Sequence, residues 1–390
     1  MILYVNSSTI NSEIEFENIL NKNENTVLLN IESKIVFKNN ISVQSHINTL
    51  KLHGKSIDSS ILQFENESFF LNFTKSVKEI EIKNLSIIGN LFFENNERVI
   101  LDNISYSGTI GSNFNTNNEY VKISNMVYKP TSYSLYNCIE LGGNLEISNS
   151  KFYGNSSCLY RLLNFFGNNK KYSFDIKDSY FNGEYVCPSI HIDGALKVTI
   201  NNSIFENGFD KVEGDGGAAI KINDSVDALV NNCTFSNNLA SPSGGTFYLI
   251  NTDYFTANNI DTYNTTSLAT GGFACIIYEN DKPNKAYFKN IRHINTDIRR
   301  DIKYGGLIMI IEKYSNVEIE NYYAENLINP VNSGNSFLVT EDSKLSINNM
   351  EINKAYGSGQ DGLFINVYKS NGVVVNINNL VLNDLYQIIR

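Results

Sequence analysis

Three acidic side chains that could bind a metal ion fall within one glycine-rich stretch of the chain. Asp210, Glu213 and Asp215 are interleaved with glycines, and loop carboxylates spaced in this way are ligands that Ca²⁺ takes in proteins. Ca²⁺ needs about six to eight oxygen ligands, and only three carboxylates converge here. We therefore favour a solvated acidic turn, and we expect no metal and no cofactor.

Other side chains capable of catalysis occur singly. His191 and Asp193 alternate with two isoleucines, so both should point outward from one strand. No nucleophile that they could activate lies beside them. Arg299-Arg300-Asp301 would offer a base only from an isolated charged loop. The sequence therefore assigns no catalytic residue and favours a protein that is not an enzyme.

The elements that would position such residues come from a short repeat. Its pattern is apolar, any, apolar, any, Asn, any, any, apolar, as in Val198, Ile200, Asn202 and Phe205. Aligned on the Asn position, the pattern occurs twelve times at intervals of 19 to 31 residues, once with Asp in place of Asn. The twelve positions are Asn84, Asn103, Asn125, Asn149, Asp178, Asn202, Asn232, Asn259, Asn290, Asn321, Asn349 and Asn379.

Apolar residues that alternate over a few positions predict short strands with one buried face. A repeat of about 27 residues with three such strands cannot close a core by itself. Copies stacked in parallel would bury one continuous core, which describes a solenoid whose coils contact only their neighbours. Helical repeats of this length would need segments with a 3.6-residue period, and none recur.

The Asn at each repeat is expected at a sharp bend between two strands. Asn tolerates a positive φ better than most residues, and such bends need that conformation. Stacked in register, each amide can also bond the amides of the coils above and below, which would form a ladder. The chain contains 61 Asn, so a single match means little. Twelve matches with apolar positions in phase require more than a high Asn content.

These features resemble the right-handed parallel β-helix of the pectin-lyase-like superfamily, which carries an Asn ladder at one turn. The resemblance covers nearly the whole chain and implies an all-β solenoid of about 12–14 coils. A weaker likeness is to the repeats of chlamydial polymorphic outer-membrane proteins, marked by GGAI and FxxN. Gly216-Gly217-Ala218-Ala219-Ile220 approaches the first mark, and Phe152-Tyr153-Gly154-Asn155 fits the second.

The pectin-lyase-like resemblance also implies the chemistry to look for. Lyases of this kind bind calcium through acidic residues and use an Arg or Lys base, whereas the related hydrolases use paired carboxylates. Asn251-Thr252-Asp253 matches the first phrase of the polygalacturonase pattern, but Gly271-Gly272 stands where its Asp pair should be. The later Gly-His-Gly and Arg-Ile-Lys phrases are absent. Asp253 is therefore interpreted as a turn residue.

Residues 1–25 are expected to cap one end of the solenoid. Ser12 to Leu20 predicts a short helix with Ser12 at its N-cap, and Tyr4-Val5 predicts a strand before it. Residues 26–390 should form one parallel β-helix domain. The segment from Tyr386 to Ile389 contains no capping helix, so either it folds over the end as a minimal cap or the chain is a fragment.

The composition excludes several classes of protein. A net charge of −10 and a pI near 5.0 leave no basic surface for nucleic acid or an anionic membrane. No segment reaches about 18 apolar residues, so no transmembrane segment is expected. No signal peptide is visible. An extracellular or cell-surface location is therefore expected from the resemblance alone.

The chain has five cysteines: Cys138, Cys158, Cys187, Cys233 and Cys275. Their spacing fits no metal site. Cys158 and Cys187 each lie nine residues after their repeat position, so coils in register would bring them within disulfide range. The alternative is that both are loop thiols, because the loops downstream differ in length.

Outward-facing side chains of the C-terminal half predict an apolar stripe along the solenoid, formed by Tyr248, Ile276, Ile308, Leu338 and Phe364. An exposed stripe of that extent would exceed what soluble monomers usually show. Either the long loops of this half fold over the stripe, or it contacts a partner such as a glycan or a surface protein.

The favoured hypothesis is a non-catalytic extracellular or cell-surface protein that acts as an adhesin-like or structural module. One alternative is a polysaccharide lyase or glycoside hydrolase of the pectin-lyase-like superfamily. Another is a repeat spacer within a larger surface protein. An acidic and basic cluster on adjacent coils would favour an enzyme, and the sequence shows none.

Overall fold

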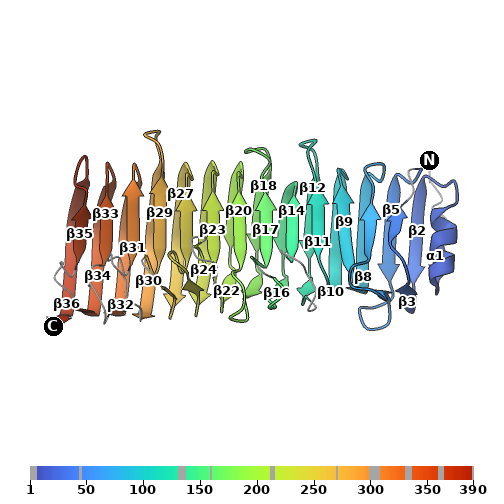
Figure 1. The fold of residues 1–390 in the computed structure, drawn as a ribbon, viewed down its shortest axis with the longest axis horizontal. Coiled ribbons are helices and arrows are strands. Elements are labelled where there is room, and N and C mark those ends of the chain that lie inside the picture. The colour runs from blue at the N-terminus through green and yellow to red at the C-terminus, as the bar shows by residue number, and fades with distance from the viewer. Residues whose placement is uncertain are drawn as a thin grey trace. The chain divides into compact units, whose positions relative to one another are not determined.

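The computed structural model describes residues 7–43, 46–130, 138–158, 160–210, 216–268, 271–297, 308–329, 336–358 and 364–388. The chain divides into two compact units, residues 1–180 (unit 1) and residues 181–390 (unit 2). Strands of each unit lie side by side in Figure 1. Each unit is a solenoid of parallel strands, because its strands pair with the equivalent strands of the next coil.

Unit 1 has two parallel sheets. Sheet A comprises β1 (Ser7–Ile10), β2 (Thr26–Ile31), β3 (Lys34–Phe37), β5 (Thr49–Gly54), β6 (Ile61–Phe64), β8 (Glu79–Ile88), β10 (Arg98–Ser107), β12 (Tyr120–Ser124), β13 (Val127–Tyr128), β15 (Asn144–Ser148), β16 (Lys151–Tyr153) and β18 (Ser173–Lys177). Sheet B comprises β4 (Ile41–Val43), β7 (Phe70–Phe73), β9 (Asn90–Glu94), β11 (Ile110–Asn113), β14 (Ile139–Gly142) and β17 (Leu163–Phe166). The strand β19 (Tyr180–Asn182) includes residues of both units.

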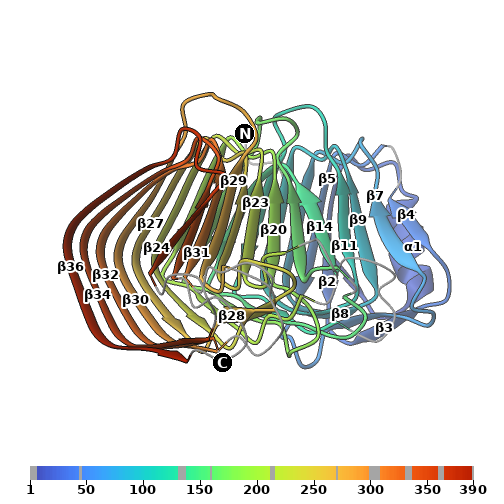
Figure 2. The same ribbon diagram turned by 60° about the vertical axis from the view of Figure 1, so that its left-hand side comes forward.

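Unit 2 repeats this arrangement with longer strands in sheet A. That sheet comprises β21 (Lys197–Asn201), β22 (Ile204–Glu206), β24 (Asp227–Ser236), β27 (Tyr254–Tyr263), β30 (Lys285–Asp297), β32 (Asn316–Asn329), β34 (Lys344–Ser358) and β36 (Val374–Ile388). Sheet B comprises β20 (Ile190–Asp193), β23 (Ile220–Asn223), β26 (Phe247–Ile250), β29 (Ala274–Tyr278), β31 (Met309–Lys313), β33 (Phe337–Thr340) and β35 (Ile365–Tyr368). The short strands β25 (Leu239–Ala240) and β28 (Thr266–Ser267) pair separately. Figure 2 shows β30, β32, β34 and β36 bending together as nested bands.

The core forms because equivalent residues of successive coils lie directly beside one another. In unit 1, Val99 of β10 pairs with Ile80 on one side and Val121 on the other, and all three are buried. In unit 2, the ring of Phe205 stacks between those of Phe181 and Phe235 at centroid distances of 5.0 and 5.2 Å. Alternation along each strand sends its other side chains outward. The apolar positions of the sequence repeat are thus the residues that contact one another in the core from coil to coil.

The helix α1 (Glu13–Leu20) lies beside β2 and β3 at one end of unit 1 (Figure 1). Ser12 is its N-cap, and the Ser12 hydroxyl accepts the Glu15 backbone N–H, as the sequence predicts. Phe16, Ile19 and Leu20 are buried. The helix therefore covers core residues that the first coil would otherwise expose.

The fold-class prediction is confirmed: the chain is an all-β parallel solenoid of about 12 turns with almost no helix. The strand predicted at Tyr4-Val5 lies outside the described residues. A single domain from residue 26 to residue 390 stays a prediction. Among the described residues, no helix is long and apolar enough to cross a membrane.

Candidate functional site

A groove of about 950 Å³ lies on the outer face of sheet B in unit 1. Strands β7, β9, β11 and β14 carry its floor, and the loop between β6 and β7 forms one wall. The lining residues are Glu65, Asn66, Glu67, Ser68, Phe70, Asn72, Asn90, Leu91, Phe92, Glu94, Thr109, Ile110, Gly111 and Glu140. Its volume falls in the range of sites that hold small molecules or short stretches of a polymer.

The wall of the groove is held by one amide side chain. Asn90 Nδ2 donates hydrogen bonds to the carbonyl oxygens of Glu67 and Phe69, at 2.7 and 3.0 Å. Asn90 Oδ1 accepts the backbone N–H and the hydroxyl of Thr109, at 2.9 and 2.8 Å. Asn90, the first residue of β9, therefore ties the loop between β6 and β7 to Thr109, which precedes β11. These bonds within the protein hold the shape of the groove.

An aromatic ring lies on the floor of the groove. Phe92 of β9 pairs with Gly111 of β11, and a Cβ atom at Gly111 would lie only 2.9 Å from Cδ2 of the Phe92 ring. The absence of a side chain at Gly111 therefore gives this ring room to lean over the next strand. The side chain of Phe92 is still 36% exposed. The ring thus offers a flat apolar surface to anything that enters the groove.

Carboxylates surround this ring. Glu94 lies two residues beyond Phe92 on β9 and accepts a hydrogen bond from Asn72 Nδ2 at 3.0 Å. Glu140 lies two strands from Phe92, because Phe92 pairs with Gly111 and Gly111 pairs with Glu140. Glu65 and Glu67 stand on the wall. No Lys or Arg is among the described residues that line the groove.

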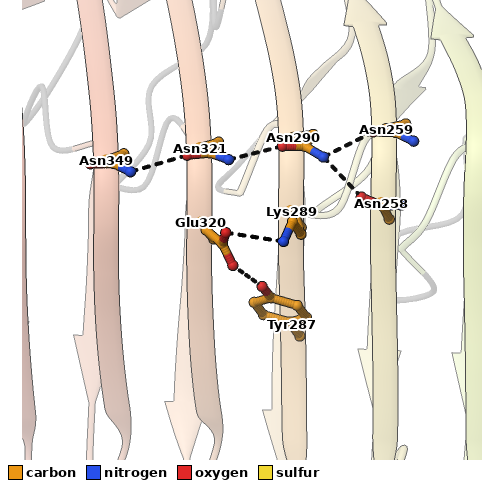
Figure 3. A network of polar contacts seen from close by, with 8 residues as sticks. All are labelled: Asn258, Asn259, Tyr287, Lys289, Asn290, Glu320, Asn321 and Asn349. Atoms are coloured by element: carbon orange, nitrogen blue, oxygen red, sulfur yellow. Dashed lines mark hydrogen bonds and ion pairs between the residues drawn. The ribbon is translucent and has the colours of Figure 1, made fainter.

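The structure places all twelve repeat positions in the left-handed backbone region, with φ between 48° and 60°. In unit 2 their side chains form a continuous ladder from Asn232 to Asn379, with Nδ2 to Oδ1 distances of 2.9 to 3.2 Å. Figure 3 shows its central part. In unit 1, Asn103 bonds Asn84 at 2.9 Å, but Asn125 bonds Asp102 instead. One line of amides through both units stays a prediction.

Polar side chains accompany the ladder on the outer face of unit 2. Figure 3 shows Glu320 of β32 between Lys289 and Tyr287 of β30. Lys289 Nζ lies 3.0 Å from the Glu320 carboxylate, and the Tyr287 hydroxyl donates to the same carboxylate. This hydrogen bond raises the pKa of Tyr287. The three groups satisfy one another across two coils, which is typical of a solvated sheet face.

A second ladder that the sequence analysis missed runs through unit 2. Asn207, Asn237, Asn264 and Asn326 each lie five residues after a repeat position and have positive φ. Asn237 bonds Asn207 at 3.3 Å and Asn264 bonds Asn237 at 2.8 Å, while Asn326 bonds Asn295 at 2.9 Å. The signal was a second Asn, five residues after the first, in successive repeats.

The prediction of an outward apolar stripe is wrong in register at β29. Ala274 lies beside the core residue Phe247, and Ile276 lies beside Leu249, so Ile276 faces the core and is 6% exposed. Cys275 takes the outward position next to Tyr248. Because side chains alternate along a strand, an offset of one residue moves each of them to the other face.

The side chains of the predicted stripe are buried or half-buried. Ile308 and Leu338 are buried, and Leu338 forms a cluster with Cys275 and Ile310 against which Tyr248 packs. Phe364 is half-buried, with its ring 5.6 Å from that of Phe337. Three of the five predicted side chains are thus buried, so they form no exposed apolar stripe. That the long loops of this half cover them stays a prediction.

The disulfide prediction is also wrong in its pairing. Cys158 is bonded to Cys138, with 5.1 Å between their Cα atoms. Cys187 is instead a buried thiol whose Sγ lies 3.8 Å from the carbonyl oxygen of Gly183. The prediction assumed that the loops after each repeat position follow the same path. They do not, and the partner of Cys158 is Cys138, which lies before it in the chain.

The remaining candidate groups are not brought together into a site. Asp253 accepts a hydrogen bond from the Tyr278 hydroxyl. Burial, together with this hydrogen bond, raises the pKa of Tyr278. Burial, together with the nearby Asp224, raises the pKa of Asp193. Glu213, Asp215 and Arg299-Arg300-Asp301 lie outside the described residues. Among the described residues, no group of three His, Cys, Asp or Glu side chains could hold a metal ion.

No protein-family model and no curated protein sequence matches this chain. Among solved structures, the chain is similar to the crystal structure of the Agl-KA catalytic domain, with a TM-score of 0.44 and 12% sequence identity. The match covers 97% of this chain and 65% of that catalytic domain.

Proposed function

We propose that the groove of unit 1 binds a carbohydrate chain, and that the protein acts through this binding. The observation that carries the proposal is the exposed Phe92 ring, which lies over Gly111 on the floor of a groove lined by carboxylates. A pyranose ring has an apolar face of C–H groups that packs on an aromatic ring, and a rim of hydroxyls that donate to carboxylates. The groove offers both kinds of contact within one site.

The spacing of the strands suits a polymer that crosses them. Neighbouring strands lie about 4.8 Å apart, which is close to the length of one sugar in an extended chain. If one sugar is stacked on Phe92, the next two sugars of the chain would therefore lie above Gly111 and Glu140. Glycan binding without catalysis agrees with the hypothesis of a cell-surface binding module. The groove, however, lies in the N-terminal half of the chain, whereas the apolar stripe was predicted in the C-terminal half.

Hydrolysis of the bound chain is the second candidate function, because two carboxylates, Glu94 and Glu140, line the same groove. Glycosidases use a pair of Asp or Glu residues on opposite sides of the scissile bond, with an inverting pair about 6.5–9.5 Å apart. Glu94 and Glu140 are offset by two strands and two residues, which places their Cα atoms roughly 12 Å apart. Side chains that lean toward each other would shorten this separation.

An extracellular or cell-surface location is part of the proposal. The Cys138–Cys158 disulfide supports it, because disulfides persist in oxidising compartments and are rare in the cytosol of mesophiles. A structural spacer would need no groove. If no glycan binds, the spacer role is the function that remains.

The experiment that tests the proposed function compares two exposed phenylalanines of the same sheet. Phe92→Ala removes the ring from the groove, whereas Phe166→Ala removes a ring that is 45% exposed on β17 and does not line the groove. We expect Phe92→Ala to weaken binding to the glycan that the wild type retains by about tenfold, because the stacking surface is lost. The measurement is titration against a panel of neutral, basic and acidic oligosaccharides.

Phe166→Ala should bind as the wild type does. Equal loss in both variants, or no retained glycan in the panel, would contradict the proposal. Release of reducing ends from a bound neutral glycan, abolished in Glu94→Gln and in Glu140→Gln, would support hydrolysis. Binding without release would leave the groove a recognition site.

A further inference from the structure

We infer that the carbohydrate held by the groove is a basic one, a polymer of amino sugars with free amino groups. The inference rests on the proposed function and concerns the class of glycan. Four carboxylates line the groove, and no Lys or Arg is among its described lining residues. A polyuronate would bring its own negative charges against these groups, so the groove disfavours acidic glycans.

Three of the four carboxylates of the groove carry negative charge that no ion pair compensates. In the part of the chain that the structure describes, Glu65, Glu67 and Glu94 form no ion pair, and the hydrogen bond that Glu94 accepts comes from the neutral amide of Asn72. A cleft lined by charges of one sign concentrates its field and attracts ligands of the opposite sign. The net charge of −10 on the whole chain adds to this attraction.

The positions of the carboxylates fit amino groups carried by alternate sugars of one chain. Glu94 lies on the same strand as Phe92, whereas Glu140 lies two strands farther along the direction that a bound chain would take. Two strands span about 10 Å, which is close to two sugars of an extended chain. An ammonium group has three donors and no acceptor, so carboxylates are suitable partners for it.

The Phe92 ring favours such a glycan over a basic peptide. The aromatic face is flat, with one half-buried carboxylate two residues along its own strand and the other two strands away. A pyranose can stack its C–H face on this ring while its amino group, at the edge of the sugar, reaches a carboxylate. A lysine side chain would supply the charge without the flat ring.

The test measures binding of four oligomers of equal length to the full chain at mildly acidic pH. They are oligoglucosamine, its N-acetylated form, oligogalacturonate and oligolysine. We expect oligoglucosamine to bind at least about tenfold more tightly than the N-acetylated form, because charge-assisted hydrogen bonds form only with the free amine. Raising salt from roughly 50 to 500 mM should weaken oligoglucosamine binding and leave the N-acetylated form little changed.

Variants connect the preference to the groove. Glu94→Gln and Glu140→Gln should each remove most of the preference for the free amine while retaining the N-acetylated form. The matched control is Glu79→Gln, at an exposed glutamate of β8 that does not line the groove, and it should leave the preference intact.

The possible failures are distinguishable. Equal binding of both glucosamine forms, with Phe92→Ala weakening both, would overturn the amino-sugar inference and leave the proposed function standing. If oligolysine binds as tightly as oligoglucosamine and Phe92→Ala has no effect, the groove binds a basic peptide. This result would also overturn the amino-sugar inference. Tightest binding of oligogalacturonate would also overturn it. If none of the four binds, both the inference and carbohydrate recognition by this groove fail.

Discussion

At the bend of each coil, one residue combines a backbone task with a side-chain task. Asn290 has φ of 53°, a conformation that costs less for Asn than for most other residues. Its amide donates to Asn259 at 3.0 Å and accepts from Asn321 at 3.0 Å. A carboxylate has no donor to pass on, and a glycine has no side chain. Asn is therefore the residue that serves both the bend and the ladder.

A buried histidine lies in the core of unit 2, between Thr262 and Ala324 of the neighbouring coils. His293 occupies the position three residues after Asn290, where other repeats carry Phe, as at Phe205 and Phe235. It is fully buried, and its Nδ1 lies 3.0 Å from the Tyr322 hydroxyl while its Nε2 contacts the hydroxyl of Thr296. Burial lowers the pKa of His293 to about 3. The imidazole is therefore neutral in the folded protein at ordinary pH.

This histidine should make stability depend on pH. Its pKa is about 3 when folded and about 6.5 when unfolded, so between these values the unfolded state binds more protons. Stability from this source is therefore fully present above about pH 6.5 and is lost as pH falls, by about 1.4 kcal/mol per pH unit. Phe at position 293 has no such dependence. We expect the free energy of unfolding of wild type relative to His293→Phe to fall by about 2 kcal/mol between about pH 7 and pH 5.

Comparing the wild type with His293→Phe removes the contribution of the carboxylates to the pH dependence of stability, because both proteins contain the same carboxylates. Urea unfolding of the two proteins at several pH values measures it. At neutral pH the variant should be no more stable than the wild type, because Tyr322 loses its ring-nitrogen partner. Parallel stability curves for the two proteins would contradict the predicted pKa shift.

At the scale of elements, the cap of unit 1 is an amphipathic helix of eight residues, about two turns. The ring of Phe16 lies edge-on to that of Phe37, with centroids 5.1 Å apart, and Phe37 in turn packs on Phe64 at 4.9 Å. The helix thus extends an aromatic column of the core by one more ring. A short helix is marginal in water by itself, so this packing must stabilise it.

Truncating the central ring of the cap should uncover the end of unit 1. Phe16→Ala is expected to cost about 3–5 kcal/mol, since a fully buried aromatic side chain is removed. The loss should appear in hydrogen exchange as faster exchange of β2 and β3, which lie under the helix. Ile14→Ala is the matched control on the same helix, because Ile14 is 70% exposed. Equal effects of the two changes would show that α1 does not cap the core.

At the scale of the whole molecule, the fold could be predicted and the site could not. The coils are visible in the sequence because each needs the same apolar alternation and the same bend, so the pattern recurs in phase. The groove brings together residues 19 to 48 positions apart in the chain, such as Phe92, Gly111 and Glu140. Each is an ordinary outward residue of its own strand. Only the register between coils brings them together.

The errors have the same origin. Cys158 pairs with Cys138, and Ile276 faces the core, because the length of each connection decides which residues of neighbouring coils meet. The repeat predicts the register at the Asn bend, where the ladder holds it. The repeat predicts the register less accurately at positions far from the Asn bend, because loops of different length lie between. The Cys pairing and the outward faces of sheet B both lie at that distance.

The stacking of similar coils predicts that unit 2 tolerates the loss of one complete coil. Removing residues 203–232 joins Asn202 to Cys233, so Phe235 takes the place of Phe205 beside Phe181. Asn237 takes the place of Asn207, and the first ladder continues from Asn202 to Asn259 in phase. Each coil of a solenoid contacts only its neighbours, so the remaining contacts are retained in kind. We expect a folded protein with a strand-type circular dichroism spectrum and one cooperative unfolding transition.

Removing residues 203–217 is the matched control, because half a coil is lost. This deletion joins a strand of sheet A to a strand of sheet B out of phase, so the apolar side chains beyond the junction cannot meet those of the preceding coil. That variant should lose cooperative unfolding and expose apolar surface that binds a hydrophobic dye. If both deletions unfold alike, coils of unit 2 are not interchangeable and the nearest-neighbour description fails. If both fold alike, the register at the Asn bend is not what holds successive coils together.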